Sequence, residues 1–428
     1  MAHEAHLLKI DARTWPGLVE LPTGRLLGLR AQKAEAEFAR ACDNGDIALD
    51  DDADLVVVHD GLFRRIAKSG WVGLGESYMA GEWYTRDYDA LVHVLSRLLS
   101  TGYNPKTPEV KPTADEGGEL PAELTALYSG DGFSHHGGLY VSGVPTTVRQ
   151  SLPVFARGSR NKTHFVDVTT FSAPDIVDRE DLGDAQRRFA QWLVESSDIH
   201  PGAHVMVYPA CALQAGIAAA DRRATVDLVS ADAARVAHVN EQLLLEGAAD
   251  AIATQLIDHP IPSLRDIQHR FDAIFAIEKF EHLLPAQRRE FVRNMDSMLA
   301  RGGHLTLLST VATDSLTAAG KNAMQILRGY VWPAFDLPTI HDVHKIVEQN
   351  SQLRIISQTH CGSHTQASLA QQRSFFTGHL REAAAAGFDE VFRRLWIYQF
   401  ALREALLALG LIDVVAFGAM HRTRGGRR

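Results

Sequence analysis

The sequence predicts an α/β protein in which a mostly parallel β-sheet carries helices on both faces and follows a smaller α/β domain. From about residue 175, short apolar runs alternate with longer amphipathic segments, which is typical of strands joined by crossover helices. The run Phe271–Ile277 is apolar almost throughout, as expected for a strand covered on both faces. The 428 residues suffice for two domains.

The N-terminal part of the chain is predicted to form its own domain, residues 1–100, followed by a linker. Periodicity and turn residues predict its elements. Helices are expected at 32–42 and 88–99, and strands at 55–58 and 61–66. Residues 101–174 are rich in proline, glycine and acidic side chains, and we expect a mostly irregular linker with one short helix at 121–128.

Residues 175–428 are predicted to form the larger domain, which ends in a helical lid. Its strands are expected at 205–208, 225–229, 251–257, 271–277 and 304–309. Its helices are expected at 179–195, from about 212, at 231–246 and at 285–300, with the lid at 340–350, 367–386 and 388–409. Gly302-Gly303 ends the fourth of these helices.

The composition restricts the class of function. The net charge of −9 argues against a nucleic-acid partner, because such domains are strongly basic. The three cysteines lack ligand spacing and suit a reducing cytoplasm. His135-His136, His200 and His204 have no second cluster to pair with, so we expect no metal site. No signal pattern or apolar run of membrane-spanning length is visible, so any membrane contact is expected to be peripheral.

The segment Pro201–Gly216 reads as a turn, a buried strand and the start of a helix. Nucleotide-binding folds place a glycine-rich loop at this point, because the backbone must approach the cofactor closely. Here the strand runs instead into Pro209-Ala210-Cys211. Proline fixes φ and removes an N–H donor, so this loop departs from a cofactor-binding loop.

Several motifs occur in order along the chain, and the most specific is Gly73–Trp83, GLGESYMAGEW. The others are Asp184–Arg188 before Pro201-Gly202, Asp258, Phe271-Asp272, Phe280-Glu281-His282, Arg328–Pro333 with Leu337-Pro338, and Gly362–Leu369. Together they resemble the cyclopropane-fatty-acyl-phospholipid synthase family, whose members are S-adenosylmethionine (SAM)-dependent lipid methyltransferases. The resemblance covers most of the chain, although unevenly.

This resemblance implies a Rossmann-like methyltransferase domain acting on a cis double bond of a phospholipid acyl chain. The alkene attacks the methyl group of SAM, and a bound bicarbonate removes a proton from the resulting cation. Carried over to this sequence, the catalytic residues are Glu281 and His282. The cofactor-binding positions are Tyr208, Pro209, Ala210, Cys211, Ser230, Asp232 and Asp258. SAM and bicarbonate are the implied cofactors.

The chain also departs from the family pattern. The segment that carries a cysteine in the family, here His164–Phe171, has none. The family's histidine or glutamine falls at Leu308 or Ser309, and its catalytic tyrosine falls at Gln399, next to Tyr398. The ribose-binding acid and the loop glycines at 207–213 are missing as well. These losses favour a degraded homologue.

Two functions of different class therefore stay open. In the first, the chain is a non-catalytic partner or regulator in acyl-chain modification, as a homodimer or as a heterodimer with an intact paralogue. In the second, it is an active SAM-dependent methyltransferase that transfers a methyl or methylene group to an unsaturated phospholipid acyl chain. A weaker third hypothesis is a lipid-binding protein. All three place it in the cytoplasm, peripherally at the inner membrane face.

Three individual residues each have two possible roles. Glu281 is either a bicarbonate ligand or an inherited acid that stabilises a helix N-terminus. Asp258 is either a contact to the adenosine or amine group of SAM or a cap at a strand end. Cys211, beside a helix N-terminus, is either a thiol of lowered pKa or a small buried residue in the place of a lost glycine, and we favour the latter.

Overall fold

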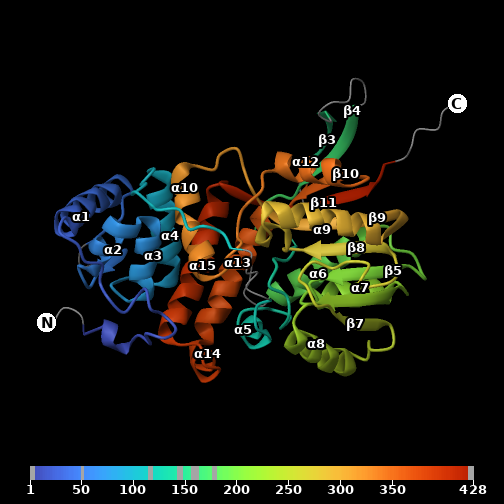
Figure 1. Cartoon of the computed structure of the whole chain (residues 1–428), viewed down its shortest axis with the longest axis horizontal. Helices are drawn as coiled ribbons and strands as arrows, with labels where there is room; N and C mark the ends of the chain where they lie inside the picture. The colour runs from blue at the N-terminus through green and yellow to red at the C-terminus, as the bar shows by residue number, and fades with distance from the viewer. Residues whose placement is uncertain are drawn as a thin grey trace. The chain divides into compact units, whose positions relative to one another are not determined.

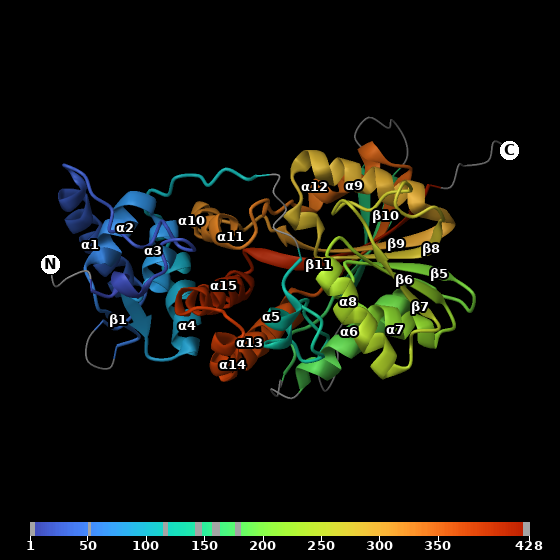
Figure 2. The same ribbon diagram turned by 60° about the horizontal axis from the view of Figure 1, so that its bottom comes forward.

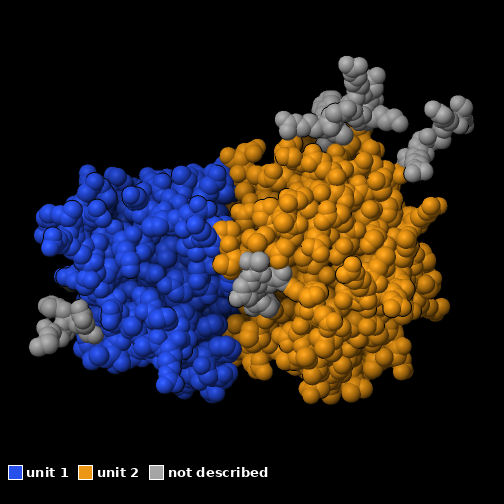
Figure 3. All heavy atoms as spheres, viewed as in Figure 1, with its two compact units in different colours: residues 1–111, 315–333, 376–411 blue, residues 112–314, 334–375, 412–428 orange. Residues whose placement is uncertain are grey.

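The computed structural model describes residues 5–49, 53–113, 119–141, 148–155, 163–175 and 181–422. The chain divides into two compact units (Figure 3). Unit 1 comprises Met1–Lys111, Ser315–Pro333 and Phe376–Leu411, and unit 2 comprises Pro112–Asp314, Ala334–Phe375 and Ile412–Arg428. The division therefore differs from the boundaries expected at 100 and 174, because most of the predicted C-terminal lid groups with the N-terminal residues.

A nine-stranded sheet of the described residues forms the centre of unit 2 (Figure 1). Its order is β3-β4-β10-β11-β9-β8-β5-β6-β7. The strands are β3 Val148–Phe155, β4 Thr163–Thr170, β5 His204–Tyr208, β6 Thr225–Ser230, β7 Ile252–Leu256, β8 Phe271–Ile277, β9 Leu299–Ala312, β10 Leu353–His360 and β11 Ile412–His421. The strands from β9 to β7 are mutually parallel, and β11 runs antiparallel to β9 and β10.

Helices cover both faces of this sheet (Figures 1 and 2). The helices of unit 2 are α5 Ala122–Ala126, α6 Asp181–Ser196, α7 Leu213–Asp221, α8 Ala233–Glu246, α9 Pro285–Met298, α12 Ile340–Asn350 and α13 Gly362–Gly378, with the 3₁₀ turn η3 at Phe280–His282. One face carries α9 and α12, and the other carries α6, α7 and α8 (Figure 2). The predicted α/β fold class with a mostly parallel sheet is confirmed.

The main core of unit 2 lies where β8 and β9 pack against α9. Phe271, Ile274, Met295, Leu305 and Phe417 are buried together there. Such burial of a large apolar side chain stabilises the fold by about 1.5–3 kcal/mol. The core thus fixes the central strands whose ends carry the candidate site.

Unit 1 is mostly helical. Its elements are η2 Leu7–Lys9, α1 Leu27–Asn44, β1 Leu55–Val57, α2 Gly61–Ser69, α3 Trp71–Met79, β2 Trp83–Thr85, α4 Tyr88–Ser100, α10 Ala318–Ala323, α11 Gln325–Tyr330, α14 Leu380–Ala385 and α15 Glu390–Ala408. The strands β1 and β2 pair antiparallel. The predicted strand at 61–66 is wrong: these residues begin α2, because Leu62, Phe63 and Ile66 recur at helical spacing and are buried.

The segment 101–174 also differs from expectation. Its C-terminal part forms β3 and β4, which pair antiparallel with each other, and β4 adds to β10 in parallel. An irregular linker was expected throughout, apart from one short helix; that helix is present as α5. Residues 114–118, 142–147 and 156–162 of this segment lie outside the described residues.

The motif Gly73–Trp83 spans α3 and the start of β2 in unit 1. A Cβ atom on Gly73 would lie 2.0 Å from the carbonyl oxygen of Arg65, so α2 and α3 can pack this closely only with glycine there. The indole of Trp83 donates to the carbonyl of Leu74 at 3.1 Å and to the hydroxyl of Ser77 at 2.9 Å. These contacts favour a structural role for the motif.

Candidate functional site

The carboxyl ends of β5, β6, β7 and β8 meet at one edge of the sheet in unit 2. From β5 the chain proceeds to β6 and β7 on one side, and β8 and β9 lie on the other. Open α/β sheets bind their ligands at such a switch point. The predicted positions Tyr208–Cys211, Ser230 and Glu281 all follow these strand ends, so the fold brings them to this edge.

The loop between β5 and α7 is closely packed. Tyr208, Ala210 and Cys211 are at most 2% exposed, and Pro209 is buried as well. The Tyr208 hydroxyl donates to the carbonyl of Pro260, and the ammonium of Lys279 lies 5.9 Å from the centre of the Tyr208 ring. The side chains of this loop are thus packed against neighbouring residues of unit 2 and are almost completely shielded from solvent.

Cys211 belongs to a chain of polar contacts that sequence spacing did not suggest. Its Sγ lies 3.0 Å from Nδ1 of His135, and Nε2 of His135 lies 3.6 Å from Oε2 of Glu278. Burial raises the pKa of the Cys211 thiol, which is the opposite of the lowering that a helix N-terminus would cause. The thiol therefore stays protonated and shares a hydrogen bond with the imidazole, whose tautomer sets the direction of the bond.

Glu278 adopts a backbone conformation that is costly for a residue with a side chain. Its φ is 47°, in the left-handed region, directly after β8. Such a conformation costs about 1–2 kcal/mol. The Glu278 N–H donates to the carbonyl of Leu308 at 2.9 Å, which holds this turn against β9. The strained turn aims the Glu278 carboxylate at His135.

A buried acid covers the end of β6. The Ser230 hydroxyl donates to Oε1 of Glu119 at 2.6 Å, and the guanidinium of Arg235 lies 3.9 Å from Oε2 of Glu119. Arg235 also donates to the carbonyl of Leu120 and to the Thr125 hydroxyl. Burial raises the pKa of Glu119, and the bond from Ser230 and the charge of Arg235 oppose this rise.

The two predicted acids near β6 and β7 have separate places. Asp232 caps α8: its Oδ1 accepts the backbone N–H of Ala234 at 2.8 Å and that of Arg235 at 3.3 Å. Asp258 lies in an exposed turn after β7. The structure therefore joins Ser230 to the buried cluster but leaves Asp258 on the surface.

Glu281 is held inside unit 2 by β9. Its Oε1 accepts the backbone N–H of Thr310 at 2.8 Å, and its Oε2 accepts the Ser309 hydroxyl at 2.9 Å. Burial raises the pKa of the Glu281 carboxyl, and these hydrogen bonds oppose the rise. His282 is half-buried, with its ring 5.7 Å from that of Phe335. Glu281 is thus a candidate proton-carrying group, in a 3₁₀ turn rather than at a helix start.

Four site residues were missed as site residues by sequence reasoning: Glu119, His135, Arg235 and Glu278. Glu119 and His135 come from the segment that was read as a linker, and their partners are far away in the sequence. Glu278 gave a usable signal, because an acid that directly follows an apolar strand lies at a sheet edge. The sequence carried no signal for the long-range contacts of the other three residues.

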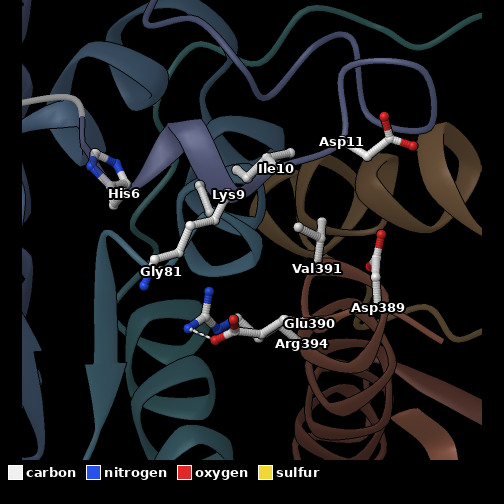
Figure 4. Close-up of a pocket in the computed structure, with 10 residues that line it drawn as sticks. His6, Lys9, Ile10, Asp11, Gly81, Asp389, Glu390, Val391 and Arg394 are labelled. Carbon is white, nitrogen blue, oxygen red and sulfur yellow. Dashed lines mark hydrogen bonds and ion pairs between the residues drawn. The ribbon is translucent and has the colours of Figure 1, made fainter. Parts of the chain in front are cut away.

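Unit 1 contains a separate hollow of about 200 Å³ between the chain near η2 and the start of α15 (Figure 4). Charged side chains of both signs line it, among them Lys9, Glu390 and Arg394. Arg394 is paired with Glu390 at 2.5 Å, as Figure 4 shows. Small-molecule sites are mostly apolar with a few convergent polar groups, so we assign no activity to this hollow.

Comparison with known proteins agrees with this architecture. A curated relative, tuberculostearic acid methyltransferase UfaA1 of Mycobacterium tuberculosis, is 23% identical over 95% of each chain. The cyclopropane synthase MmaA2 of the same organism has a TM-score of 0.54 at 14% identity, covering 73% of this chain and 99% of its own. Coclaurine N-methyltransferase, solved with N-methylheliamine and SAH, has a TM-score of 0.56 at 13% identity, covering 81% and 98%.

The family model described as mycolic acid cyclopropane synthetase matches residues 168–417, which is more than half of the chain. The match includes β5 to β9, and with them the strand ends that carry the candidate site. The resemblance seen in the sequence motifs is thereby confirmed. The chain belongs to the mycolic acid cyclopropane synthetase family.

Proposed function

We propose that this chain serves membrane-lipid acyl-chain modification as a non-catalytic homologue, a partner or regulator of an intact methyltransferase of its family. The observation that carries the proposal is the closed edge at β5, β6 and β8. There Cys211 is hydrogen-bonded to His135, and Ser230 is hydrogen-bonded to Glu119. Two groups at positions that would meet a cofactor, Cys211 and Ser230, are thus paired within the chain. Oε2 of Glu119 and Nε and Nη1 of Arg235 make no hydrogen bond within the described residues.

The residues at this edge do not fit SAM. A nucleotide cofactor needs an acid for its ribose hydroxyls and glycines for close backbone approach. The family resemblance assigns an acid to the strand position that the buried, apolar Val207 holds here, and Pro209 offers no N–H. Opening the edge would also break the Cys211–His135 and Ser230–Glu119 bonds. Leaving a buried polar group unpaired costs about 1–3 kcal/mol.

The resulting penalty supports a weakened affinity for the cofactor. Two broken bonds at about 1–3 kcal/mol each weaken binding by roughly 30-fold to 10⁴-fold. This loss adds to the missing ribose contact. With the ribose contact at a further loss of about 1–3 kcal/mol, a ligand that binds an intact site at about 1 µM would bind here at about 0.2 mM or more weakly.

A second candidate, an active methyltransferase, is favoured by one observation. Glu281, the carboxylate that the family resemblance assigns to bicarbonate, is present, fully buried and of raised pKa. The full-length match to a relative named as a methyltransferase agrees with it. Its site would lack the matching cysteine and carry Leu308 or Ser309 in the place of histidine or glutamine. We therefore rank it second.

The proposal includes assembly and membrane contact. We expect the chain to act as a dimer, with a second copy or with an intact paralogue, at the membrane surface where acyl chains are modified. None of the helices formed by the described residues is long and apolar enough to cross a bilayer. A peripheral location at the membrane is part of the proposal.

A lipid methylation assay separates the two candidates. The purified full-length chain is incubated with labelled SAM and vesicles of oleoyl phospholipid, alone and with an intact family member. We expect no product from the chain alone and an altered rate or yield for the intact enzyme in its presence. Product from the chain alone that disappears in Glu281→Gln would contradict the proposal and establish the second candidate.

A further inference from the structure

Three metal-ligating side chains meet at the opposite edge of the sheet in unit 2. His204 is the first residue of β5, Asp227 lies in β6, and His269 precedes β8. One ligand atom from each lies within 4.8 Å of the other two. We propose that this cluster binds a divalent transition-metal ion of the zinc type through two imidazoles and one carboxylate. The proposal is independent of the proposed function.

The distances suit such an ion. Oδ2 of Asp227 lies 2.8 Å from Nε2 of His269 and 3.5 Å from Nε2 of His204. Ligand atoms about 2.0 Å from a tetrahedral zinc ion are about 3.3 Å apart, so the spacing suits the ion. The two stacked rings would turn out of their stack on binding, because an imidazole binds a metal in its own plane. Imidazole nitrogen with one carboxylate oxygen is a donor set that zinc accepts.

The burial of the cluster calls for a cation. The Asp227 side chain is only 5% exposed, and a buried carboxylate needs a positive partner. Nε2 of His204 is buried and makes no hydrogen bond within the described residues, although it faces this carboxylate. A metal ion between the three side chains would give this nitrogen a partner and would add a full positive charge beside the carboxylate, which already has a hydrogen bond to His269.

The surrounding structure holds the two imidazoles close to each other. The rings of His204 and His269 stack with centres 4.3 Å apart and planes 11° apart, and both meet the ring of Phe271 edge-on. The backbone N–H of His204 donates to Asp272 at 2.9 Å, which fixes the start of β5. Both imidazoles therefore present Nε2 to the same carboxylate oxygen.

One side of the cluster is open to solvent. The His204 and His269 side chains are 29% and 41% exposed, which gives an ion an entry path and leaves room for water as a further ligand. An ion held there would link the start of β5, the strand β6 and the segment that leads into β8. Because the unfolded chain has no such site, binding would stabilise the fold.

The test uses the full-length chain after treatment with a chelator. Zinc chloride is titrated calorimetrically, and cobalt(II) binding is followed by its visible absorption. We expect one ion per chain, with affinity at least about tenfold lower in His269→Ala and in Asp227→Asn. Zinc at 100 times its Kd should lower the unfolding equilibrium constant about 100-fold, seen as a rise in Tm that His269→Ala abolishes.

The control variant is His200→Ala, which removes an exposed imidazole four residues before His204 and should leave zinc binding unchanged. His269 is partly exposed, so its variant should fold even if Asp227→Asn does not. No saturable binding up to millimolar zinc would overturn the proposal and leave a simple His–Asp ion pair. Binding that survives both His269→Ala and Asp227→Asn would place the ion elsewhere and overturn it as well.

Discussion

Replacing Arg235 with methionine removes the cation that faces Glu119 at the carboxyl end of β6. Methionine preserves much of the volume and the apolar stem, so the substitution tests the charge rather than the packing. The Arg235 side chain is 1% exposed and that of Glu119 is 11% exposed, so water cannot replace the lost partner. The variant therefore probes the pair that closes the candidate site.

The expected cost follows from the contacts. At 3.9 Å, two unit charges attract by about 4 kcal/mol at an effective dielectric constant of about 20. The bonds to the Leu120 carbonyl and the Thr125 hydroxyl contribute about 1 kcal/mol each. Relief from burying the guanidinium offsets part of this sum. We expect Arg235→Met to lower the free energy of unfolding by about 3 kcal/mol at pH 8.

The loss should depend on pH. Burial already raises the pKa of Glu119, and without the opposing charge of Arg235 that pKa rises further. The folded variant then holds a proton that the unfolded chain releases above the ordinary carboxyl pKa, so its stability falls as pH rises. Each unit of pKa shift is worth about 1.4 kcal/mol, and we expect the deficit to grow by about 1–2 kcal/mol between pH 5 and pH 8.

Urea unfolding at pH 5 and pH 8, followed by tryptophan fluorescence, measures this deficit. The double variant Arg235→Met/Glu119→Gln is the control, because it removes the titrating carboxyl and should lose the pH-dependent part. A deficit of equal size at both pH values in the single variant would refute the reasoning. So would a double variant that keeps the same pH dependence.

Three further predictions concern other parts of the chain. Gly73→Ala should lower the free energy of unfolding by about 3 kcal/mol, because its Cβ atom would lie 2.0 Å from a backbone oxygen. Gly28→Ala, with open space around it in α1, should raise that free energy by about 0.5–1 kcal/mol. Equal Tm shifts for the two variants would contradict this prediction. Burial raises the pKa of Glu281, so this carboxyl makes the stability of the chain fall as the pH rises from 5 to 8. Glu281→Gln should reduce that fall. Urea unfolding curves with the same pH dependence in the variant and the original chain would count against the prediction. Cys211, buried and with a raised pKa, should alkylate slowly in the native chain and fully in denaturant; prompt native labelling, located by peptide mass, would mean that the edge is open.

Much of the fold of unit 2 could be predicted from periodicity. The strand Phe271–Ile277 and the helix Ile340–Asn350 have the predicted bounds, because each is a continuous apolar or amphipathic segment with clear ends. The helix α2 was misread as a strand, because the six-residue segment 61–66, with apolar residues on both sides of Arg64-Arg65, is too short to distinguish the two periods. The strands β10 and β11 were not predicted, although they complete the sheet beside β9.

The candidate site was predicted only in part. Its place at the ends of β5 and β6 followed from the fold, and Glu281 from a motif. The hydrogen bonds from Glu119 and His135 to the strand ends could not be predicted. These two residues come from a segment whose composition resembles a linker, and their partners are far away in the sequence. The cluster of His204, Asp227 and His269 escaped for the same reason: sheet pairing, rather than sequence spacing, brings its members together.

Calorimetric titration of SAM and S-adenosylhomocysteine into the purified full-length chain tests the central claim most directly. Because Cys211 and Ser230 are hydrogen-bonded to His135 and Glu119, the account predicts no saturable binding below about 0.1 mM ligand. An intact family member titrated in parallel shows that the ligands are active. Saturable binding at micromolar SAM would contradict the closed edge and return the chain to the active methyltransferases of its family.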